Sequence, residues 1–304
     1  MIDFIAAYTG QLAALITSFL WAATSTFFTL AGRKVGSGVL NRTRVLLAIL
    51  LLLLAHLVLQ QPLPTDISTD RLFWLSVSGV IGLALGDAFL FQAFVMVGPR
   101  LSMLLMALAP VIAAVFAWIF LGESLSAGQI TGILLTMGGI AWVVADSNGR
   151  ESEQIGRRKY LIGVLFALAG ATGQALGLVT AKQGLYGDFS ALSATLIRML
   201  AAAVVLWLIA AFRRQVKPTF VLLSRHKRSL RFILAGAFVG PFLGVTFSLI
   251  AVQKTEVGVA STLMALAPVI LLPVSYFVFD ERFSWQAVAG TLLAFSGVAL
   301  LFLV

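Results

Sequence analysis

Three charged residues lie in apolar stretches of the chain, and they are the strongest candidates for chemistry. Asp87 stands in the run GVIGLALGDAFLF, and Arg44 and Arg198 stand near the starts of two other apolar runs. A carboxylate in such surroundings can carry a proton, pair with a cationic ligand or pair with an arginine. Arg198 could hold a substrate carboxylate, although both arginines could instead anchor their segments at a membrane surface.

A second set of candidates consists of hydroxyl, amide and aromatic side chains in the same apolar stretches. Together with Asp87 and Arg198, we expect them to line a substrate-binding cavity, where each hydroxyl could instead bond a backbone carbonyl of its own helix. The set comprises Trp21, Thr24, Ser25, Phe89, Gln92, Thr172, Gln174, Phe247 and Ser248.

These residues do not form a catalytic motif. An intramembrane aspartyl protease needs two carboxylates, but only Asp87 lies within an apolar span, and neither GxSxG nor HExxH occurs. The absence of cysteine excludes disulfides and thiolate metal sites, and there is no nucleotide-binding loop. We therefore expect a protein that is not an enzyme, with no catalytic residues, no metal and no cofactor.

The elements that carry these residues are predicted to be membrane-spanning helices. Sixty per cent of the residues are hydrophobic and 11% are charged, which is too few charges for a water-facing surface of this size. Apolar stretches of about 20 residues can cross a bilayer as helices. The sequence predicts an all-α membrane protein with ten spans, at 10–32, 44–61, 72–97, 101–121, 125–145, 160–181, 191–212, 232–253, 257–279 and 284–303.

The distribution of positive charge predicts an orientation. The net charge is +9, and 17 of the 21 Lys and Arg residues lie in loops that follow odd-numbered spans. Because Lys and Arg gather on the cytoplasmic side of membrane proteins, this bias places the odd loops in the cytoplasm and both termini outside. The charge thus reflects topology in the cytoplasmic (inner) membrane, and we expect the lipid bilayer rather than nucleic acid as a partner.

The sequence contains an internal repeat. MALAPVI occurs at Met106 and again at Met264, and ATSTFFTLAGRKVG from Ala23 aligns with ATGQALGLVTAKQG from Ala171. We expect a first five-helix repeat at 1–149, a charged cytoplasmic linker at 150–159 and a second repeat at 160–304. Because five is odd, the second copy must enter the membrane from the opposite face. Such inverted repeats are typical of transporters, with the substrate near the midplane.

The residues of the repeat resemble those of a known family. A proline-bearing fourth span, then LGESLS, then the glycine-punctuated GQITGILLTMGGIAWVV resembles the EamA repeat, and the stretch from Met264 to Val304 is similar. Trp21 and the arginines that open the second helix of each repeat also fit. The resemblance implies the drug/metabolite transporter superfamily, ten-helix branch, whose members export amino acids and other small metabolites or exchange them.

Prolines, glycines and a glutamate recur at matched positions in the two copies. Pro110 and Pro268 are expected in mid-helix, as paired hinges or as fixed kinks. The glycines at 82, 86, 236, 240 and 244 form stripes that favour close helix packing. Glu123 is expected to cap a helix or to occupy a tight turn.

The sequence thus predicts a secondary transporter, acting as a monomer or homodimer, that moves small metabolites such as amino acids by alternating access. Export is the expected direction. The alternative is proton-coupled efflux of cationic or lipophilic drugs, for which protons are the candidate coupling partner and Asp87 the candidate carrier.

Overall fold

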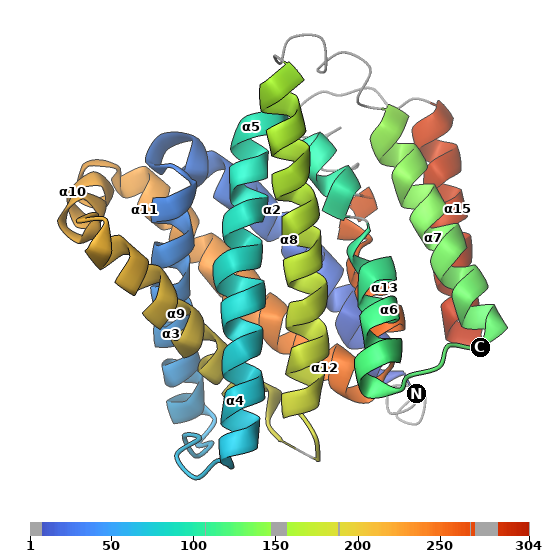
Figure 1. Ribbon diagram of the computed structural model, residues 1–304, viewed down its shortest axis with the longest axis horizontal. Helices are drawn as coiled ribbons and strands as arrows, with labels where there is room; N and C mark the ends of the chain where they lie inside the picture. The colour runs from blue at the N-terminus through green and yellow to red at the C-terminus, as the bar shows by residue number, and fades with distance from the viewer. Residues whose placement is uncertain are drawn as a thin grey trace.

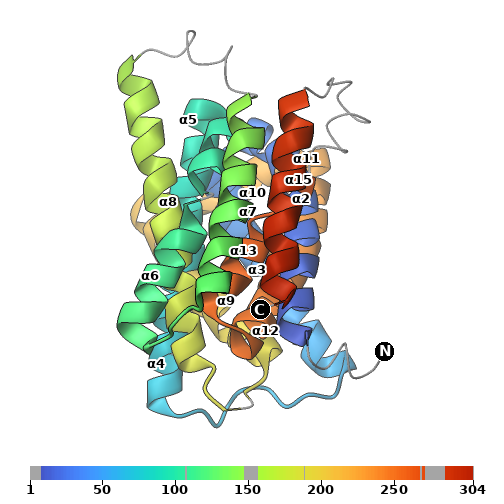
Figure 2. The ribbon, with the colours of Figure 1, turned by 90° about the vertical axis from the view of Figure 1, so that its right-hand side faces the viewer.

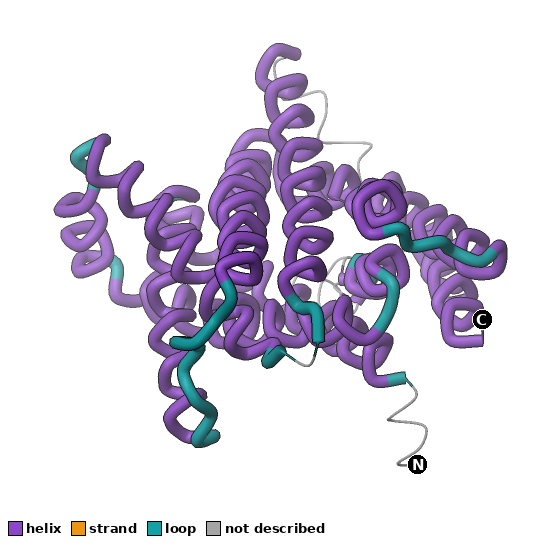
Figure 3. Tube along the Cα trace, turned by 60° about the horizontal axis from the view of Figure 1, so that its bottom comes forward, coloured by secondary structure: helices purple, strands orange, loops and turns teal. Residues whose placement is uncertain are grey.

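The computed structural model describes residues 8–106, 108–146, 157–187, 189–267, 269–270 and 285–303, and this part of the chain contains helices and no strands (Figure 3). Six helical segments are long and apolar enough to cross a membrane, and three shorter apolar helices accompany them. The six begin at Thr9, Ser37, Thr69, Arg158, Ala191 and Lys227.

The two halves of the chain contain similar series of helices. Its helices are α2 (Thr9–Val35), α3 (Ser37–Val58), α4 (Thr69–Ser78), η1 (Gly79–Gly86), α5 (Asp87–Met106), α6 (Ala109–Leu121) and α7 (Ala127–Asp146). The second half forms α8 (Arg157–Gly184), α9 (Ala191–Phe212), α10 (Val216–Arg225), α11 (Lys227–Ala237), η3 (Phe238–Gly244), α12 (Val245–Lys254), α13 (Val257–Met264) and α15 (Trp285–Leu303).

The first helix of each half packs against helices of the other half. Helix α8 lies along α4, η1 and α5 of the first half (Figure 1), and α2 lies in the equivalent way along α11, η3 and α12 of the second half. Two pairs of equivalent helices also pack on each other: α3 on α9, and α7 on α15 (Figure 2). Helix α6 packs on α13 and α8. Exchanging the two halves therefore maps the described contacts of α8 and α2, of α3 with α9, and of α7 with α15 onto one another.

A widened helical turn occurs at the same place in each half. The π-helical segments η1 (Gly79–Gly86) and η3 (Phe238–Gly244) each interrupt the third apolar helix of their half. Both segments end on glycines that are 158 residues apart, the offset of the sequence repeat. π-Helical turns are rare and are often found at functional sites.

Glycines let η1 approach α8 closely, as the stripes predict. A Cβ atom added at Gly177 would lie 2.8 Å from the Cα atom of Gly82, and one added at Gly173 would lie 2.7 Å from that of Gly86. Backbone thus faces backbone at this crossing. The equivalent crossing of η3 with α2 is different, because Gly240 and Gly244 pack against side chains of Thr24 and Trp21.

The helix boundaries correct several expectations. Helix α3 starts at Ser37 rather than at residue 44, which places Arg44 two turns inside the helix. Helix α5 continues to Met106, past the expected end at residue 97, and α6 starts only at Ala109. The described part of the chain therefore shows a short fourth apolar helix of 13 residues, and the expected full set of ten spans is not reached.

Candidate functional site

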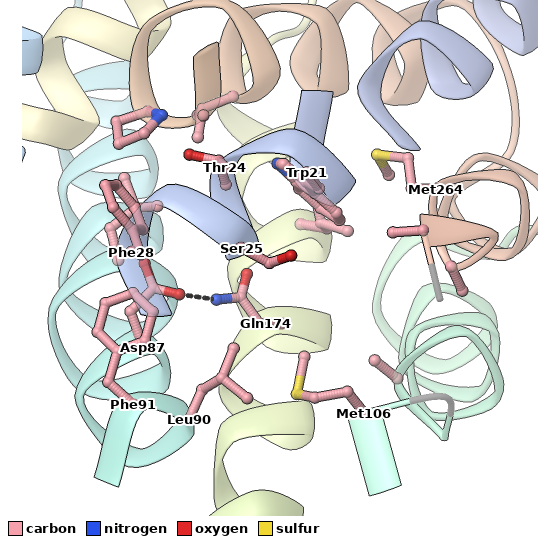
Figure 4. A pocket seen from close by; sticks show the side chains of 18 of the residues that line it. Trp21, Thr24, Ser25, Phe28, Asp87, Leu90, Phe91, Met106, Gln174 and Met264 are labelled. Atoms are coloured by element: carbon pink, nitrogen blue, oxygen red, sulfur yellow. Dashed lines mark hydrogen bonds between the residues drawn. The ribbon is translucent and has the colours of Figure 1, made fainter. Parts of the chain in front are cut away.

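A cavity of about 170 Å³ lies between the two halves of the chain. Its lining comes from α2, α3, η1, α5 and α6 of the first half and from α8, η3, α12 and α13 of the second. Figure 4 shows that Trp21, Ser25, Gln174 and Met106 lie around a common space, with Met264 on its far side. A space bounded by both repeats is where an inverted-repeat carrier would hold its substrate.

Five residues of the predicted set line this cavity: Trp21, Thr24, Ser25, Asp87 and Gln174. Three of them belong to consecutive turns of α2, and the other two come from α5 and α8. Thr24 also joins the halves directly, because its hydroxyl donates a 2.6 Å hydrogen bond to the carbonyl oxygen of Gly236. The rest of the wall is largely apolar.

Asp87 is buried in this wall, and both of its carboxylate oxygens have partners. One oxygen accepts a hydrogen bond from the guanidinium of Arg44 in an ion pair, and the other accepts one from the amide of Gln174 at 2.5 Å (Figure 4). The carboxylate is therefore engaged within the protein. This geometry favours the arginine-paired alternative over a free carboxylate that waits for a cationic ligand.

Arg44 is held on several sides and does not reach a membrane surface. Only 4% of its surface is exposed, so the expectation of interfacial anchoring is wrong for this residue. Its guanidinium donates to the side chain of Asn41 at 3.0 Å and to the carbonyl oxygen of Leu83 at 3.3 Å. The rings of Phe28 and Phe91 lie 5.8 and 5.1 Å from the guanidinium carbon, at cation–π distance.

Arg198, the counterpart of Arg44 in the second half, is also buried but is not held in the same way. Its surface is 2% exposed, so interfacial anchoring is wrong here too, and its Nε atom has no hydrogen-bond partner in the described structure. The guanidinium lies over η1, where a Cβ atom at Gly82 would be 3.4 Å from its Nη2 atom. It interacts electrostatically with Asp87 but does not line the cavity.

Arg44 and Arg198 contact successive turns of the helix formed by η1 and the start of α5. Arg198 lies against Gly79 and Gly82, and Arg44 binds at Leu83 and Asp87, one turn further along. Two buried guanidinium groups thus share one carboxylate. Burying a charge without full pairing is costly, so this excess positive charge needs a structural or functional reason.

The other predicted site residues lie outside the cavity lining. The side chain of Phe89 packs on Phe166 with ring centroids 5.8 Å apart, and Gln92 accepts a hydrogen bond from Ser37 at 3.4 Å. The remaining three make local contacts. Thr172 and Ser248 donate to carbonyl oxygens of their own helices at 3.0 and 2.7 Å, and Phe247 packs against the main hydrophobic core.

The structure adds wall residues that the sequence did not single out, among them Phe28, Phe91, Phe94 and Met264. These aromatic and thioether side chains are common in apolar helices, so composition gives no signal for them. For Phe28 and Phe91 a signal exists once Arg44 is placed inside a helix, since a buried guanidinium needs partners around it.

Pro110 lines the cavity but does not lie in mid-helix. Helix α6 begins at Ala109, so Pro110 occupies its first turn, where a proline leaves no hydrogen bond unmade. The mid-helix kink predicted there is therefore wrong, and the role of Pro110 as a hinge stays a prediction. Pro268 lies outside the described residues.

Glu123 does act as a cap, but for a helix distant in sequence. Its carboxylate accepts a 2.9 Å hydrogen bond from the backbone N–H of Val257, the first residue of α13, and forms an ion pair with Lys182. Within the described chain, no group of His, Cys, Asp and Glu side chains is arranged to hold a metal ion.

The fold and the cavity define an integral membrane protein built from two helical repeats around a central space. Comparison with family models gives two matches to the EamA-like transporter family, at residues 8–145 and 161–303. The chain belongs to this family, and the matches cover both repeats. No curated protein sequence matches it.

A solved structure is similar over nearly the whole chain. It is described only as the crystal structure of a protein, with a TM-score of 0.72 and 18% sequence identity, and the match covers 96% of each chain. At this identity the likeness shows the fold alone.

Proposed function

We propose that the protein is a secondary transporter that carries small metabolites, such as amino acids, outward across the cytoplasmic membrane by alternating access. The observation that carries this proposal is the cavity between the repeats, which is lined from both halves of the chain. Membership of a transporter family supports it. Rocking of the halves about the cavity would expose it to each side in turn.

The chemistry of the lining supports an amphipathic solute of modest size. Trp21, Phe28 and Phe94 offer apolar and aromatic surface, while Ser25 and Gln174 offer hydrogen-bonding groups. A binding site with mostly apolar walls and a few polar groups suits a molecule with one polar end and one apolar end. Amino acids with large apolar side chains have this form.

The engagement of Asp87 argues for metabolite transport over drug efflux. A proton-coupled exporter of cations needs a carboxylate that can exchange a proton for the substrate, whereas Asp87 is already bound by Arg44 and Gln174. We therefore keep proton-coupled efflux of cationic drugs as the second candidate, to be tested in the same assay.

The test is uptake of radiolabelled solutes into proteoliposomes that contain the pure protein, after a thermal-shift screen of amino acids, organic acids and lipophilic cations. Ser25→Leu, which fills the cavity, should abolish uptake of the substrate without lowering the melting temperature. Ser296→Leu is the matched control, because both serines donate to carbonyl oxygens of their own helices and Ser296 is exposed. Equal uptake by the two variants would place the substrate elsewhere.

A further inference from the structure

An ion pair ties three segments together at one end of the helical bundle. The Nζ atom of Lys182 lies 2.5 Å from the Oε1 atom of Glu123, and it donates a 2.8 Å hydrogen bond to the carbonyl oxygen of Thr255. The second carboxylate oxygen of Glu123 accepts from the backbone N–H of Val257 at 2.9 Å. The connection between α6 and α7, the end of α8 and the start of α13 are thereby joined.

This network lies one helical turn beyond the wall of the cavity. Leu178 lines the cavity, and Lys182 follows it by four residues on the same face of α8. Ser261 lines the cavity, and Val257 precedes it by four residues on the same face of α13. The ion pair therefore sits across the end of the space that the proposed substrate would occupy.

The local sequence positions both charges with little freedom. Gly122 adopts a left-handed conformation, with φ of 67°, which ends α6 and turns the chain so that Glu123 points toward α13. Lys182 lies in the last turn of α8, where a positive charge interacts favourably with the carbonyl ends of the helix. The side chain of Glu123 is 14% exposed and that of Lys182 is 25% exposed, so water can replace each partner of the ion pair.

The lysine at the equivalent place of the first repeat behaves differently. Lys34 aligns with Lys182 in the repeat, lies at the end of α2, and is exposed. It forms no ion pair within the described residues. The charge distribution places Lys34 in the cytoplasm and Glu123, Lys182 and Thr255 outside. Of the two equivalent lysines, then, only Lys182 has an ion-pair partner among the described residues.

We infer that the Glu123–Lys182 ion pair is a latch that closes one end of the cavity and must open for solute to pass on that side. This inference rests on the proposed function as a carrier. Breaking the pair would release the start of α13 from the end of α8 and would let those helices separate at that face. A packing strut, by contrast, would add stability without controlling access.

The experiment uses the absence of native cysteine. Ser25→Cys provides a single thiol in the cavity, and its reaction with an impermeant maleimide is followed separately in right-side-out and inverted vesicles. Glu123→Gln and Lys182→Gln should each speed labelling from the Glu123 side by about fivefold, the population change that about 1 kcal/mol produces. Glutamine at 123 retains an acceptor for the N–H of Val257, so this change removes the ion pair alone.

Two further variants make the result specific. Because both residues act in one pair, the double variant Glu123→Gln/Lys182→Gln should label no faster than the faster single variant. Lys34→Gln is the matched control and should leave labelling from the Glu123 side unchanged. Thermal unfolding of each variant reports whether it is folded, and Lys182→Gln serves if Glu123→Gln does not fold.

The outcomes separate the latch from the proposed function. Unchanged labelling in both folded single variants, with a lower melting temperature, would identify a packing strut and overturn the inference. An equal increase for Lys34→Gln would do the same. Labelling needs no substrate, so faster labelling in a protein that transports none of the tested solutes would retain the latch and refute the metabolite carrier.

Discussion

Asp87 and Arg44 form an ion pair inside the cavity wall, and Arg198 lies one turn along the same segment without an equivalent carboxylate. The pair joins α5 to α3 across the end of η1. Its two members come from the same repeat, whereas Arg198 comes from the other. The asymmetry arises because the repeat partner of Asp87 is Val245, so two equivalent arginines share a single acid.

Removing the acid should destabilise the protein. We expect Asp87→Asn to lower the free energy of unfolding by about 3–5 kcal/mol, because it leaves two buried guanidinium groups without a counter-charge. The double variant Asp87→Asn/Arg44→Gln should lose less than the sum of the two single losses. Thermal unfolding in detergent measures both. A stable Asp87→Asn variant whose uptake collapses would instead return Asp87 to the role of proton carrier or cation ligand.

The two equivalent arginines should respond oppositely to the same change. Arg44→Met removes the partner of Asp87 and should lower the melting temperature. Arg198→Met removes a buried cation whose Nε atom has no hydrogen bond, so stability should stay equal or rise. If Arg198 holds a substrate carboxylate, the same variant should lose uptake while it remains folded. Equal melting temperatures for the two variants would contradict the difference in their pairing.

The crossing of η1 with α8 should not tolerate a single methyl group. Gly177→Ala places a Cβ atom 2.8 Å from the backbone of Gly82, and we expect it to cost about 1–3 kcal/mol. Gly138→Ala is the control, because its Cβ would meet only a leucine methyl group at 4.0 Å. There alanine should be neutral or stabilising by about 0.5–1 kcal/mol through helix propensity. Melting temperatures of the two variants settle the comparison.

Pro110→Ala should leave folding intact but slow transport. Pro110 lies in the first turn of α6, so replacing it by alanine adds no hydrogen bond within α6. Alanine would, however, permit α5 and α6 to join across their boundary and would stiffen a wall of the cavity. Uptake rates in proteoliposomes, at equal melting temperature, measure the effect. A parental rate would show that Pro110 only begins the helix.

The orientation can be tested with two single cysteines at exposed positions. In the predicted topology, Phe220→Cys should be protected from an impermeant thiol reagent in intact cells, whereas Thr65→Cys should react. Phe220 lies on α10, in the most basic region of the chain, and Thr65 lies between α3 and α4. The reverse labelling pattern would invert the topology and with it the outer position of Glu123.

Composition and the internal repeat were sufficient to predict the helical class and a cavity shared by both halves, and the resemblance of the repeat to the EamA pattern predicted the family. The sequence patterns were insufficient to predict the type of helical turn and the exact ends of helices, which depend on backbone geometry. The run from Gly79 to Gly86 is apolar whether it forms an α or a π turn, so the widened segment left no signal. The start of α3 was placed late because Arg42 and Arg44 look like loop residues until Thr219 and Asp87 supply partners from elsewhere in the fold.

The same limit applies to single site residues. A hydroxyl in an apolar helix can face a cavity, as that of Ser25 does, or lie buried away from it, as that of Ser248 does. Both of these hydroxyls bond a carbonyl of their own helix. The difference lies in the rotation of each helix about its axis, which tertiary packing sets. Glu123 was correctly expected to cap, but its partner lies 134 residues away, beyond the reach of any local pattern.

The exchanged packing has a consequence for the duplication itself. Because the glycine face of η1 is completed by α8, and that of η3 by α2, neither copy of the repeat contains the partner that its own third helix requires. A solitary half-chain would leave these glycine faces without their partner helices, and it could recover the missing contacts only from another copy of the repeat. Because both copies of the repeat lie in one chain, each copy always has its packing partner, in a one-to-one ratio.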